Sequence, residues 1–501
     1  MRGFLLSLVN ASDPLVLAKL LPGQGARQSV MTRMELRGTS PRARAVEPWL
    51  EELRATLQLA WPLVLLQLGQ VGIHTTDILM IARLGPEALA AGSLAMHWFI
   101  LPWLFCLGIL SGVPALAAQA RGARDPRGVR RTVRQGLWLA FAISLPTMFL
   151  LWHTPAILRL AGQQPELAEA AGGYARAAMW GVAPSLGFLV LRGFVSVLSR
   201  PGVATVIMLG GVLFNVVVNY GLIFGNFGLP RLELVGAGLG SALVHTMMFS
   251  GLLAWVLIDR RFRRYYLLVR FFRSDWPRMA ALLRVGWPVG FILLFEVGLF
   301  TTGTFMMGWV GTNALAASAL AAQLTNVTFM VPLGIGQAAS VRVGIAAGAR
   351  NPDGVRRAGW SALALGALCM SVAAVFYLAM PEVLIGLFLD LSDPGSAEVL
   401  AIGVAFLTIA AFFQIADGSQ VIGSSILRGL SDTRIPMFYS AFGYWAIGCF
   451  SAYMLAFPLG LGGKGIWIGW ALGLTATAIL LVRRFSLRDR LGLVERVYAA
   501  R

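Results

Sequence analysis

The feature that most constrains the fold is a succession of apolar stretches that occupies most of the 501-residue chain. Crossing a bilayer as a helix takes about 20 mostly apolar residues. Only 13% of the residues are charged, against about 25% in typical soluble domains. The sequence therefore predicts an all-α, polytopic membrane protein with twelve transmembrane helices, near residues 55–82, 88–118, 136–158, 168–198, 203–226, 236–258, 284–308, 314–345, 358–388, 397–428, 436–458 and 464–482.

The positions of the arginines predict the orientation of these helices. The net charge of +18 comes from basic residues between apolar stretches, such as "RGARDPRGVRR" and "DRRFRRYYLLVR", and not from a separable nucleic-acid-binding domain. The arginine-rich segments follow the second, sixth, eighth and twelfth predicted helices. The positive-inside rule places them, and both termini, in the cytoplasm. We therefore expect a multi-pass protein of the cell (inner) membrane.

The two halves of the chain repeat each other at a constant offset. Trp61-Pro62 corresponds to Trp287-Pro288 (287 − 61 = 226), and "GARDPRGVRR" at 122–131 corresponds to "GARNPDGVRR" at 348–357 (348 − 122 = 226). The repeat predicts two lobes of six helices, both inserted in the same orientation. A pseudo-two-fold axis along the membrane normal would relate them, with a site at their interface near the middle of the bilayer.

This repeat divides the chain into five parts. We expect a cytoplasmic N-terminal arm at 1–50, an N-lobe at 51–258, a cytoplasmic inter-lobe loop at 259–283, a C-lobe at 284–482 and a basic cytoplasmic tail at 483–501. The arm is interpreted as disordered, or as an overlong start that precedes Met31 or Met34.

Three acids lie inside predicted helices: Asp77, Glu296 and Asp417. A charge at the centre of a bilayer costs at least about 2.5–3.5 kcal/mol, so such acids usually face a bundle interior or a cavity and serve ion or proton pathways. A structural ion pair with Arg192 or Arg342 is the alternative. The acids do not follow the repeat, because Glu296 corresponds to Gln70 (296 − 226 = 70) and Asp77 to Gly303 (77 + 226 = 303).

Amide side chains accompany the acids. Asn215 and Asn219 are four residues apart and share one helix face, from which they could reach Asp77. The same predicted helices carry Gln67 and Gln70, and Gln414 and Gln420. Interhelical packing through hydrogen bonds is the alternative role for each amide. The chain shows no zinc motif, nucleophile triad or nucleotide-binding loop, so we expect neither an enzyme nor a bound cofactor.

Several motifs resemble one transporter family. "HTTDILMIARLGPEALAAGSLA", "LLFEVGLF", "FQIADGSQVIGSSILRGLSDTRIPM" and "NVVVNYGLIFGNFGLP" are similar to segments of the multidrug and toxic compound extrusion (MATE) transporters, in the NorM-type branch. The resemblance covers about residues 50 to 485. It implies export of organic cations, drugs and toxins by alternating access, in exchange for H⁺ or Na⁺.

The resemblance also implies roles for individual residues. Asp77, Asn215 and Asn219 would form a cation-coupling site in the N-lobe, and Glu296 and Asp417 one in the C-lobe, with Na⁺ as one candidate ion there. Gln67, Gln70, Phe413, Gln414 and Gln420 are candidates for the substrate cavity. Some sodium-coupled members have a tyrosine where this chain has Phe413, and the missing hydroxyl favours a proton.

Two other functions stay open at this stage. A lipid-linked-precursor flippase of the same superfamily fold would need a large basic cavity or extra helices. A membrane-embedded enzyme would need a catalytic constellation and a sizeable loop outside the membrane. Twelve predicted helices and the three acids within them disfavour the flippase, and the sequence shows no such constellation or loop for the enzyme. We expect a transporter that acts as a monomer in the lipid membrane, moves small molecules and binds no nucleic acid.

Overall fold

The computed structural model describes residues 41–269, 271–389 and 396–499, with side chains described from residue 47. The chain separates into two units, residues 1–52 and 53–501, and the described part of the first unit is 41–52. The predicted N-terminal arm at 1–50 therefore lies largely outside the described residues. Residues 53–501 hold all twelve predicted spans.

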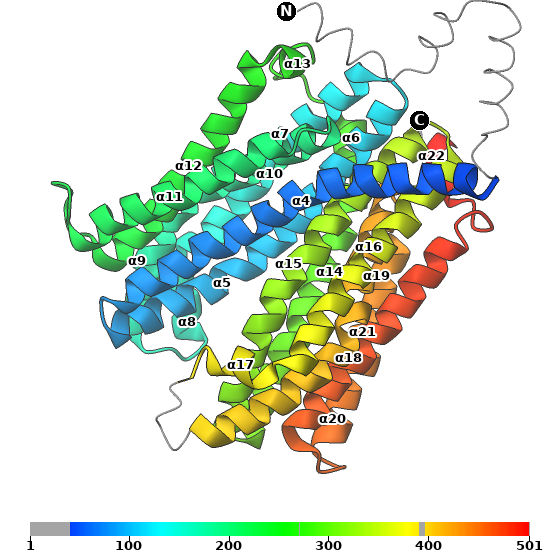
Figure 1. Cartoon of the computed structure of the whole chain (residues 1–501). Helices are drawn as coiled ribbons and strands as arrows, with labels where there is room; N and C mark the ends of the chain where they lie inside the picture. Colours follow the sequence, from blue (N-terminus) through cyan, green and yellow to red (C-terminus); the bar gives the residue numbers. More distant parts are fainter. Residues whose placement is uncertain (1–40, 270, 390–395, 500–501) are drawn as a thin grey trace, which may run out of the picture. The chain divides into compact units, whose positions relative to one another are not determined.

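The described chain is helical, without strands (Figure 1). Many of its helices have a proline in the first turn, where a missing N–H costs nothing. The helices of the N-terminal half are α4 (Pro41–Ala82), α5 (Pro86–Leu110), α6 (Gly112–Gly122), α7 (Pro126–Trp152), α8 (Thr154–Leu160), α9 (Pro165–Ala178), η1 (Met179–Gly181), α10 (Val182–Val197), α11 (Gly202–Phe224), α12 (Glu233–Ile258) and α13 (Arg260–Arg263). Those of the C-terminal half are α14 (Trp276–Val310), α15 (Thr312–Gly348), α16 (Pro352–Ala379), α17 (Pro381–Gly386), α18 (Ser396–Gly429), α19 (Arg434–Ala441), η2 (Phe442–Cys449), α20 (Phe450–Ala456), α21 (Gly462–Ser486) and α22 (Leu493–Ala499).

Within the described residues the helices account for the twelve membrane spans that the sequence predicts. Eleven helices in the described part of the chain are long and apolar enough to cross a membrane. The remaining predicted span, 436–458, consists of α19, η2 and α20 in direct succession. Its middle part, Phe442–Cys449, is a π-helix, a rare form that often marks functional sites. The predicted fold class, six helices in each of two halves, is confirmed.

Some boundaries differ from the prediction. Helix α14 begins at Trp276 and not near 284, because the Asp275 side chain accepts a hydrogen bond from the backbone N–H of Arg278 and Pro277 occupies the first turn. The connection between the halves is correspondingly shorter than the predicted 259–283 and contains α13. The basic tail holds the last residues of α21 and the short helix α22.

The repeat is visible in local geometry as well as in sequence. Arg124 and Arg350, 226 residues apart (350 − 124 = 226), both have φ of 56°. Each is followed by an N-cap: Asp125 accepts a hydrogen bond from the N–H of Gly128, and Asn351 accepts one from Gly354. The sequence repeat is therefore a repeat of backbone conformation.

The halves share an apolar core at one end and have separate cores towards the other. The shared core includes Leu116, Leu282 and Ile426, which come from both halves and lie near the arginine-rich loops. A second core, with Ile81 and Leu158 among its members, belongs to the N-terminal half. A third, which includes Trp467, belongs to the C-terminal half. Figure 1 shows the two sets of helices, blue to green and yellow-green to red.

Close backbone approach joins the halves at this shared core. A Cβ on Gly108 would lie 2.3 Å from Cα of Gly290, and a Cβ on Gly334 would lie 2.8 Å from N of Val64. The two contacts are related by the repeat (334 − 108 = 226 and 290 − 64 = 226). Gln119 adds a polar contact, because its Nε2 donates to the backbone oxygen of Gly429 at 2.9 Å and to Oγ of Ser431 at 2.9 Å. The junction of the halves is thus itself pseudo-symmetric.

Candidate functional site

In the N-terminal half, two helices, α11 and α12, direct polar side chains at Asp77 on α4. The Nδ2 atoms of Asn215 and Asn219 donate to Oδ1 of Asp77 at 2.8 and 2.6 Å, and Oγ of Ser241 donates to Oδ2 at 3.0 Å. Asp77 is 4% exposed and both asparagines are 0% exposed. Three donors thus satisfy a carboxylate that has little access to water, which is the condition for keeping a charge inside a protein.

The local geometry explains why these side chains meet. Asn215 and Asn219 are one turn apart on α11, so both face α4, as their spacing predicts. Gly240 on α12 makes room for the second amide: a Cβ there would lie 2.0 Å from Oδ1 of Asn219. The Oδ1 atoms of both asparagines are buried and have no hydrogen-bond partner within the described residues. Two free acceptors beside a carboxylate form a strongly electronegative site, and buried acceptors of this kind call for an explanation.

In the C-terminal half, Glu296 and Asp417 meet through one amide. Nε2 of Gln420 lies 3.0 Å from Oε1 of Glu296 and 3.5 Å from Oδ1 of Asp417. The hydroxyl of Tyr444 donates to Oε1 of Gln420 at 2.7 Å, which fixes the orientation of the amide. Glu296 is 8% exposed and Asp417 is 6% exposed. The two acids that the sequence assigns to one site therefore lie within reach of the same donor.

The π-helix η2 supplies the tyrosine of this site. Tyr444 is fully buried and lies in the π-helical segment Phe442–Cys449. A π-helical turn holds one more residue than an α-helical turn, so it changes the faces that the neighbouring residues present. Tyr444 reaches Gln420 on α18 from this segment.

A second polar group lies beside the acids. Gln414, which is 0% exposed, donates to Oγ1 of Thr328 at 3.2 Å, and that hydroxyl is 2.8 Å from the hydroxyl of Tyr377. Phe413 is also buried and packs in the apolar core against Trp467, with ring centroids 6.3 Å apart. Phe413, a candidate for the substrate cavity, is therefore part of the C-terminal core.

The remaining candidates lie on α4. Gln67 accepts a hydrogen bond from Nη1 of Arg192 at 3.2 Å, and both residues are half-buried. Gln70 is half-buried as well. Arg192, one of the two arginines considered as ion-pair partners for the buried acids, thus donates to an amide.

The two sites do not occupy equivalent places in the repeat. The segments "GAGLGSAL" of α12 and "GIWIGWAL" of α21 correspond, which pairs Ser241 with Trp470 (470 − 241 = 229). A Cβ on Gly303, the counterpart of Asp77, would lie 2.3 Å from Cζ2 of Trp470. A tryptophan packed on a glycine therefore fills, in the C-terminal half, the place of the acid and the serine.

Sequence reasoning missed Ser241, Tyr444 and Thr328. Ser241 follows a glycine-rich stretch of α12, and small and hydroxyl side chains commonly pack between membrane helices, so nothing in the sequence separates it from a packing residue. Thr328 lies one turn before Pro332 in α15, and its counterpart in the repeat is Pro102 (328 − 226 = 102), so the repeat does not indicate it. No sequence pattern indicates the π-helix that presents Tyr444.

Comparison with known families gives a match that covers both halves. The family model MatE matches residues 62–221 and 288–454. The second match begins 226 residues after the first (288 − 62 = 226), at the offset of the internal repeat.

Similar proteins share most of the chain's length. A protein of Mesorhizobium japonicum, named "Probable multidrug resistance protein NorM", is 47% identical over 453 residues, which are 90% of this chain and 97% of that protein. A protein of the same name from Brucella suis is 41% identical over 454 residues, covering 90% of this chain and 96% of its own length.

Solved structures share the fold. The eukaryotic MATE transporter AtDTX14 aligns with a TM-score of 0.78 at 20% identity, over 90% of this chain and 99% of its own. A multidrug resistance MATE family transporter described as outward-facing aligns with a TM-score of 0.80 at 21% identity, over 89% of this chain and 96% of its own.

Proposed function

The chain belongs to the MatE family, the multidrug and toxic compound extrusion transporters, and we propose that it exports organic cations across the cell membrane in exchange for an inorganic cation. The observation that carries the proposal is the presence of buried carboxylates in both halves. Amide side chains contact them in each half, and a serine hydroxyl does so at Asp77. Charged groups at this depth are costly and serve ion pathways when they are kept. The names of the similar proteins support multidrug export as the overall activity.

At Asp77, the free acceptors suit a cation. The carboxylate carries the negative charge, and the Oδ1 atoms of Asn215 and Asn219 add two acceptors without partners in the described chain. An ammonium group of a substrate would donate to these oxygens. A proton on Asp77 would instead remove the charge and weaken the hold on such a substrate. Competition of this kind couples entry of one cation to release of the other.

At Glu296 and Asp417, the arrangement favours a proton over Na⁺. Nε2 of Gln420 lies within hydrogen-bond distance of both acids, and Oε1 of Gln420 already accepts from Tyr444. The amide thus turns a donor, and not an oxygen ligand, towards the carboxylates. Sodium is a hard cation that needs several oxygen ligands. Phe413 supplies none, because its side chain has no oxygen, and its ring packs on Trp467. A proton needs one carboxylate oxygen.

Alternating access would separate the halves at their junction. The shared core and the bonds of Gln119 to Gly429 and Ser431 join the halves near the arginine-rich loops. By the positive-inside rule this is the cytoplasmic side, with both termini there. Opening towards the cytoplasm would break these contacts. Substrate or proton would shift the equilibrium between the inward-open and outward-open states only as far as its affinities for the two states differ. The transporter would do this as a monomer in the inner membrane, without a bound cofactor.

The test is transport by purified protein in liposomes, with pH and sodium gradients imposed separately. A pH gradient alone should drive uptake or release of a fluorescent organic cation, at an unchanged rate when sodium is replaced by potassium. Strict dependence on sodium at constant pH would overturn proton coupling but would not contradict the export of organic cations. No movement of any organic cation under either gradient would overturn the export proposal.

A further inference from the structure

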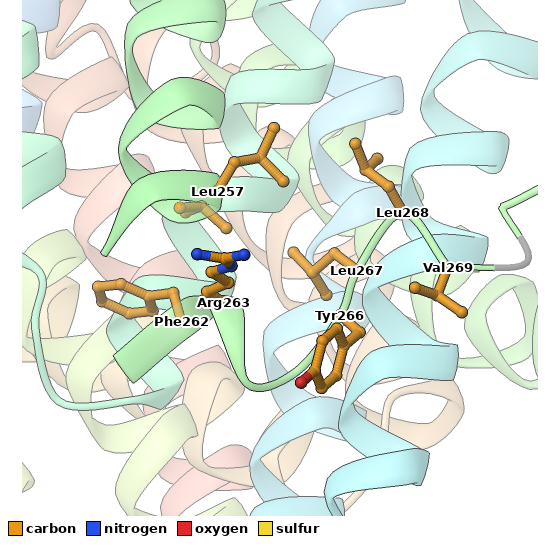
Figure 2. Close-up of a pocket in the computed structure, with 8 residues that line it drawn as sticks. Leu257, Phe262, Arg263, Tyr266, Leu267, Leu268 and Val269 are labelled. Carbon is orange, nitrogen blue, oxygen red and sulfur yellow. The ribbon is translucent and has the colours of Figure 1, made fainter. Parts of the chain in front are cut away.

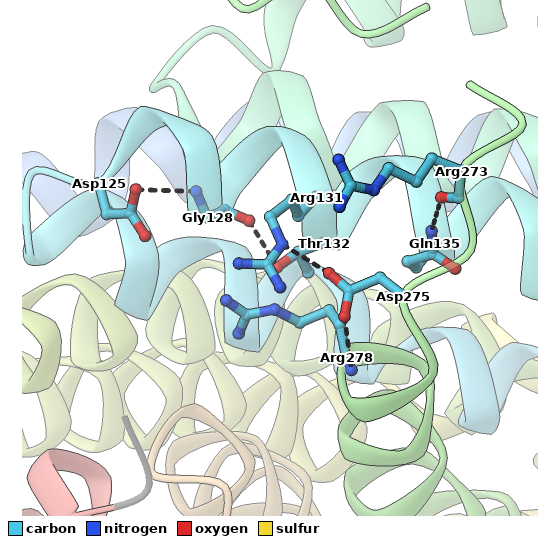
Figure 3. A network of polar contacts seen from close by, with 8 residues as sticks. All are labelled: Asp125, Gly128, Arg131, Thr132, Gln135, Arg273, Asp275 and Arg278. Atoms are coloured by element: carbon cyan, nitrogen blue, oxygen red, sulfur yellow. Dashed lines mark hydrogen bonds and ion pairs between the residues drawn. The ribbon is translucent and has the colours of Figure 1, made fainter. Parts of the chain in front are cut away.

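The segment that connects the two halves is fixed against α7. It comprises residues 259–275, of which 270 lies outside the described residues. Arg131 forms an ion pair with Asp275, with 2.5 Å between Nε and Oδ2, and Gln135 donates to the backbone oxygen of Arg273 at 3.2 Å (Figure 3). Trp138 donates to the backbone oxygen of Phe271 at 2.9 Å and stacks on its ring. The end of the segment next to α14, at 271–275, is therefore held against α7.

The charge of Asp275 is part of this anchor. Partial burial alone would raise the pKa of the Asp275 carboxyl, but the hydrogen bond from Arg131 and the backbone N–H of Arg278 outweigh burial and lower the pKa below its usual value. Asp275 is thus ionised near neutral pH and holds the end of the segment at the start of α14.

The connecting segment carries exposed apolar side chains at the boundary of the membrane. It runs from the end of α12 at Ile258 to the start of α14 at Trp276, and both helices are membrane spans. Phe272 is 86% exposed and Tyr266 is 60% exposed. A group of exposed apolar residues at such a place marks an interaction surface.

A small pocket lies in the first part of this segment. Figure 2 shows the side chains around it, with Arg263 beside apolar neighbours. Its volume is about 170 Å³, below the range of about 300–1,000 Å³ typical of drug-sized ligands. Its lining consists of Val256, Leu257, Phe262, Arg263, Tyr266, Leu267, Leu268 and Val269. Such a lining suits part of an alkyl chain next to a negatively charged group.

One arginine, Arg263, lines the pocket, and three more lie within three residues of it in the sequence. Among the described residues, no ion pair with an acid involves the exposed side chains of Arg260, Arg261, Arg263 or Arg264. Arginine binds phosphate through its planar, multiply donating guanidinium. Four exposed guanidinium groups therefore lie within five residues, and one of them, that of Arg263, lines the apolar pocket.

We propose that the connecting segment binds an anionic phospholipid, with the phosphate on the arginines of 260–264 and part of one acyl chain in the pocket. The combination of an apolar pocket and arginines without acidic partners favours a negatively charged amphiphile. A nucleic acid would contact the arginines but would not fill the apolar pocket. The segment is the covalent link between the two halves, so a bound lipid would act on the part of the chain that must adapt when the halves move. This inference does not depend on which cation is exported.

The experiment measures binding of dioleoyl phosphatidylglycerol to the purified full-length protein in detergent, by native mass spectrometry. Each arginine near a membrane surface contributes about 1 kcal/mol towards anionic lipid, or roughly five-fold. The double variant Arg263→Gln/Arg264→Gln should therefore bind this lipid about 30-fold more weakly. The matched control is Arg124→Gln/Arg127→Gln, which removes two exposed arginines from another arginine-rich loop; its affinity should change less than about three-fold.

Two further ligands separate the lipid from its parts. Dioleoyl phosphatidylcholine, which has the same chains and no net charge, should bind more weakly than phosphatidylglycerol and equally to wild type and variants. Glycerol phosphate lacks the acyl chains, so we expect no measurable difference in its binding between the wild type and Arg263→Gln/Arg264→Gln. Equal losses in both double variants would mean that diffuse positive charge attracts the lipid, and would overturn the site. Glycerol phosphate binding as tightly as the lipid would overturn the role of the pocket.

Discussion

Gly122 and Gly348 each lie against the backbone of the opposite half. A Cβ on Gly122 would lie 2.0 Å from the oxygen of Ile345, and a Cβ on Gly348 would lie 2.0 Å from the oxygen of Gln119. The two contacts are copies of each other, since 348 − 122 = 226 and 345 − 119 = 226. The pseudo-two-fold axis therefore passes between these helices, where the halves touch without side chains between them.

This contact predicts the effect of one methyl group. Gly122→Ala and Gly348→Ala should each destabilise the protein by about 1–3 kcal/mol through overpacking, and by similar amounts because their surroundings are equivalent. Gly210→Ala is the control, because it lies within helix α11 with nothing within 4 Å of the added Cβ. Melting temperatures in detergent measure the three effects. Equal melting temperatures for Gly122→Ala and Gly210→Ala would refute the close approach of the halves.

A second prediction concerns the amides beside Asp77. Gly240→Ala should displace Asn219, because the new Cβ would lie 2.0 Å from its Oδ1. One hydrogen bond to a charged group contributes about 1.5–3 kcal/mol, so we expect organic-cation transport to fall by about ten-fold or more. Gly251→Ala on the same helix should be neutral, since its Cβ would meet a neighbour only at 3.9 Å. Equal transport by the two variants in liposomes would show that Asn219 does not contribute.

Glu296→Gln tests the acids of the C-terminal half. The change is nearly isosteric, so insertion and folding should persist, while the loss of a charge and a proton site should abolish coupled export. Asp417→Asn should behave in the same way, because Gln420 contacts both acids. If Glu296 instead formed a structural ion pair, Glu296→Gln should lower the free energy of unfolding by about 3–5 kcal/mol. Melting temperature and liposome transport, measured together, distinguish the two; a stable Glu296→Gln protein with normal export would remove Glu296 from the mechanism.

Tyr444→Phe tests the group that orients the shared amide. Without the hydroxyl, Oε1 of Gln420 loses its partner and the amide can turn, which should lower the transport rate at an unchanged fold. The cost in stability should be about 1–3 kcal/mol for the buried acceptor left unpaired. Tyr453→Phe, at an exposed position of α20, serves as control. A shifted pH dependence of transport in Tyr444→Phe alone would identify Tyr444 as a positioning residue; matching profiles for both variants would contradict that role.

The anchor of the connecting segment predicts a pH dependence of stability. The pKa of Asp275 is lowered in the folded protein, so its ionised form stabilises the fold above the unfolded value of about 3.9 and this contribution is lost as the pH falls through the folded value. Asp275→Asn should lower the melting temperature at pH 7 and have less effect near pH 3. Because Arg131 is half exposed, the difference should be small. An equal effect at both pH values would exclude the charge as its cause.

The sequence by itself determined the membrane class, the duplication and most of the acids and amides that meet. Long apolar stretches leave little choice but helices, because a backbone in lipid must satisfy its own hydrogen bonds. The four-residue spacing of Asn215 and Asn219 fixed their common face, and the ungapped offset of 226 related the halves.

Only the tertiary structure decided which side chains complete each site. Ser241 contacts Asp77 from a helix 164 residues further on, and Tyr444 reaches Gln420 from a π-helical segment. Phe413, one turn before Asp417, packs into the core. The physical reason is that local sequence sets the period of a helix, whereas the rotation and depth at which helices meet depend on packing summed over the whole bundle. The repeat could not supply that information, because Trp470 and Gly303 fill in one half the place that Ser241 and Asp77 occupy in the other.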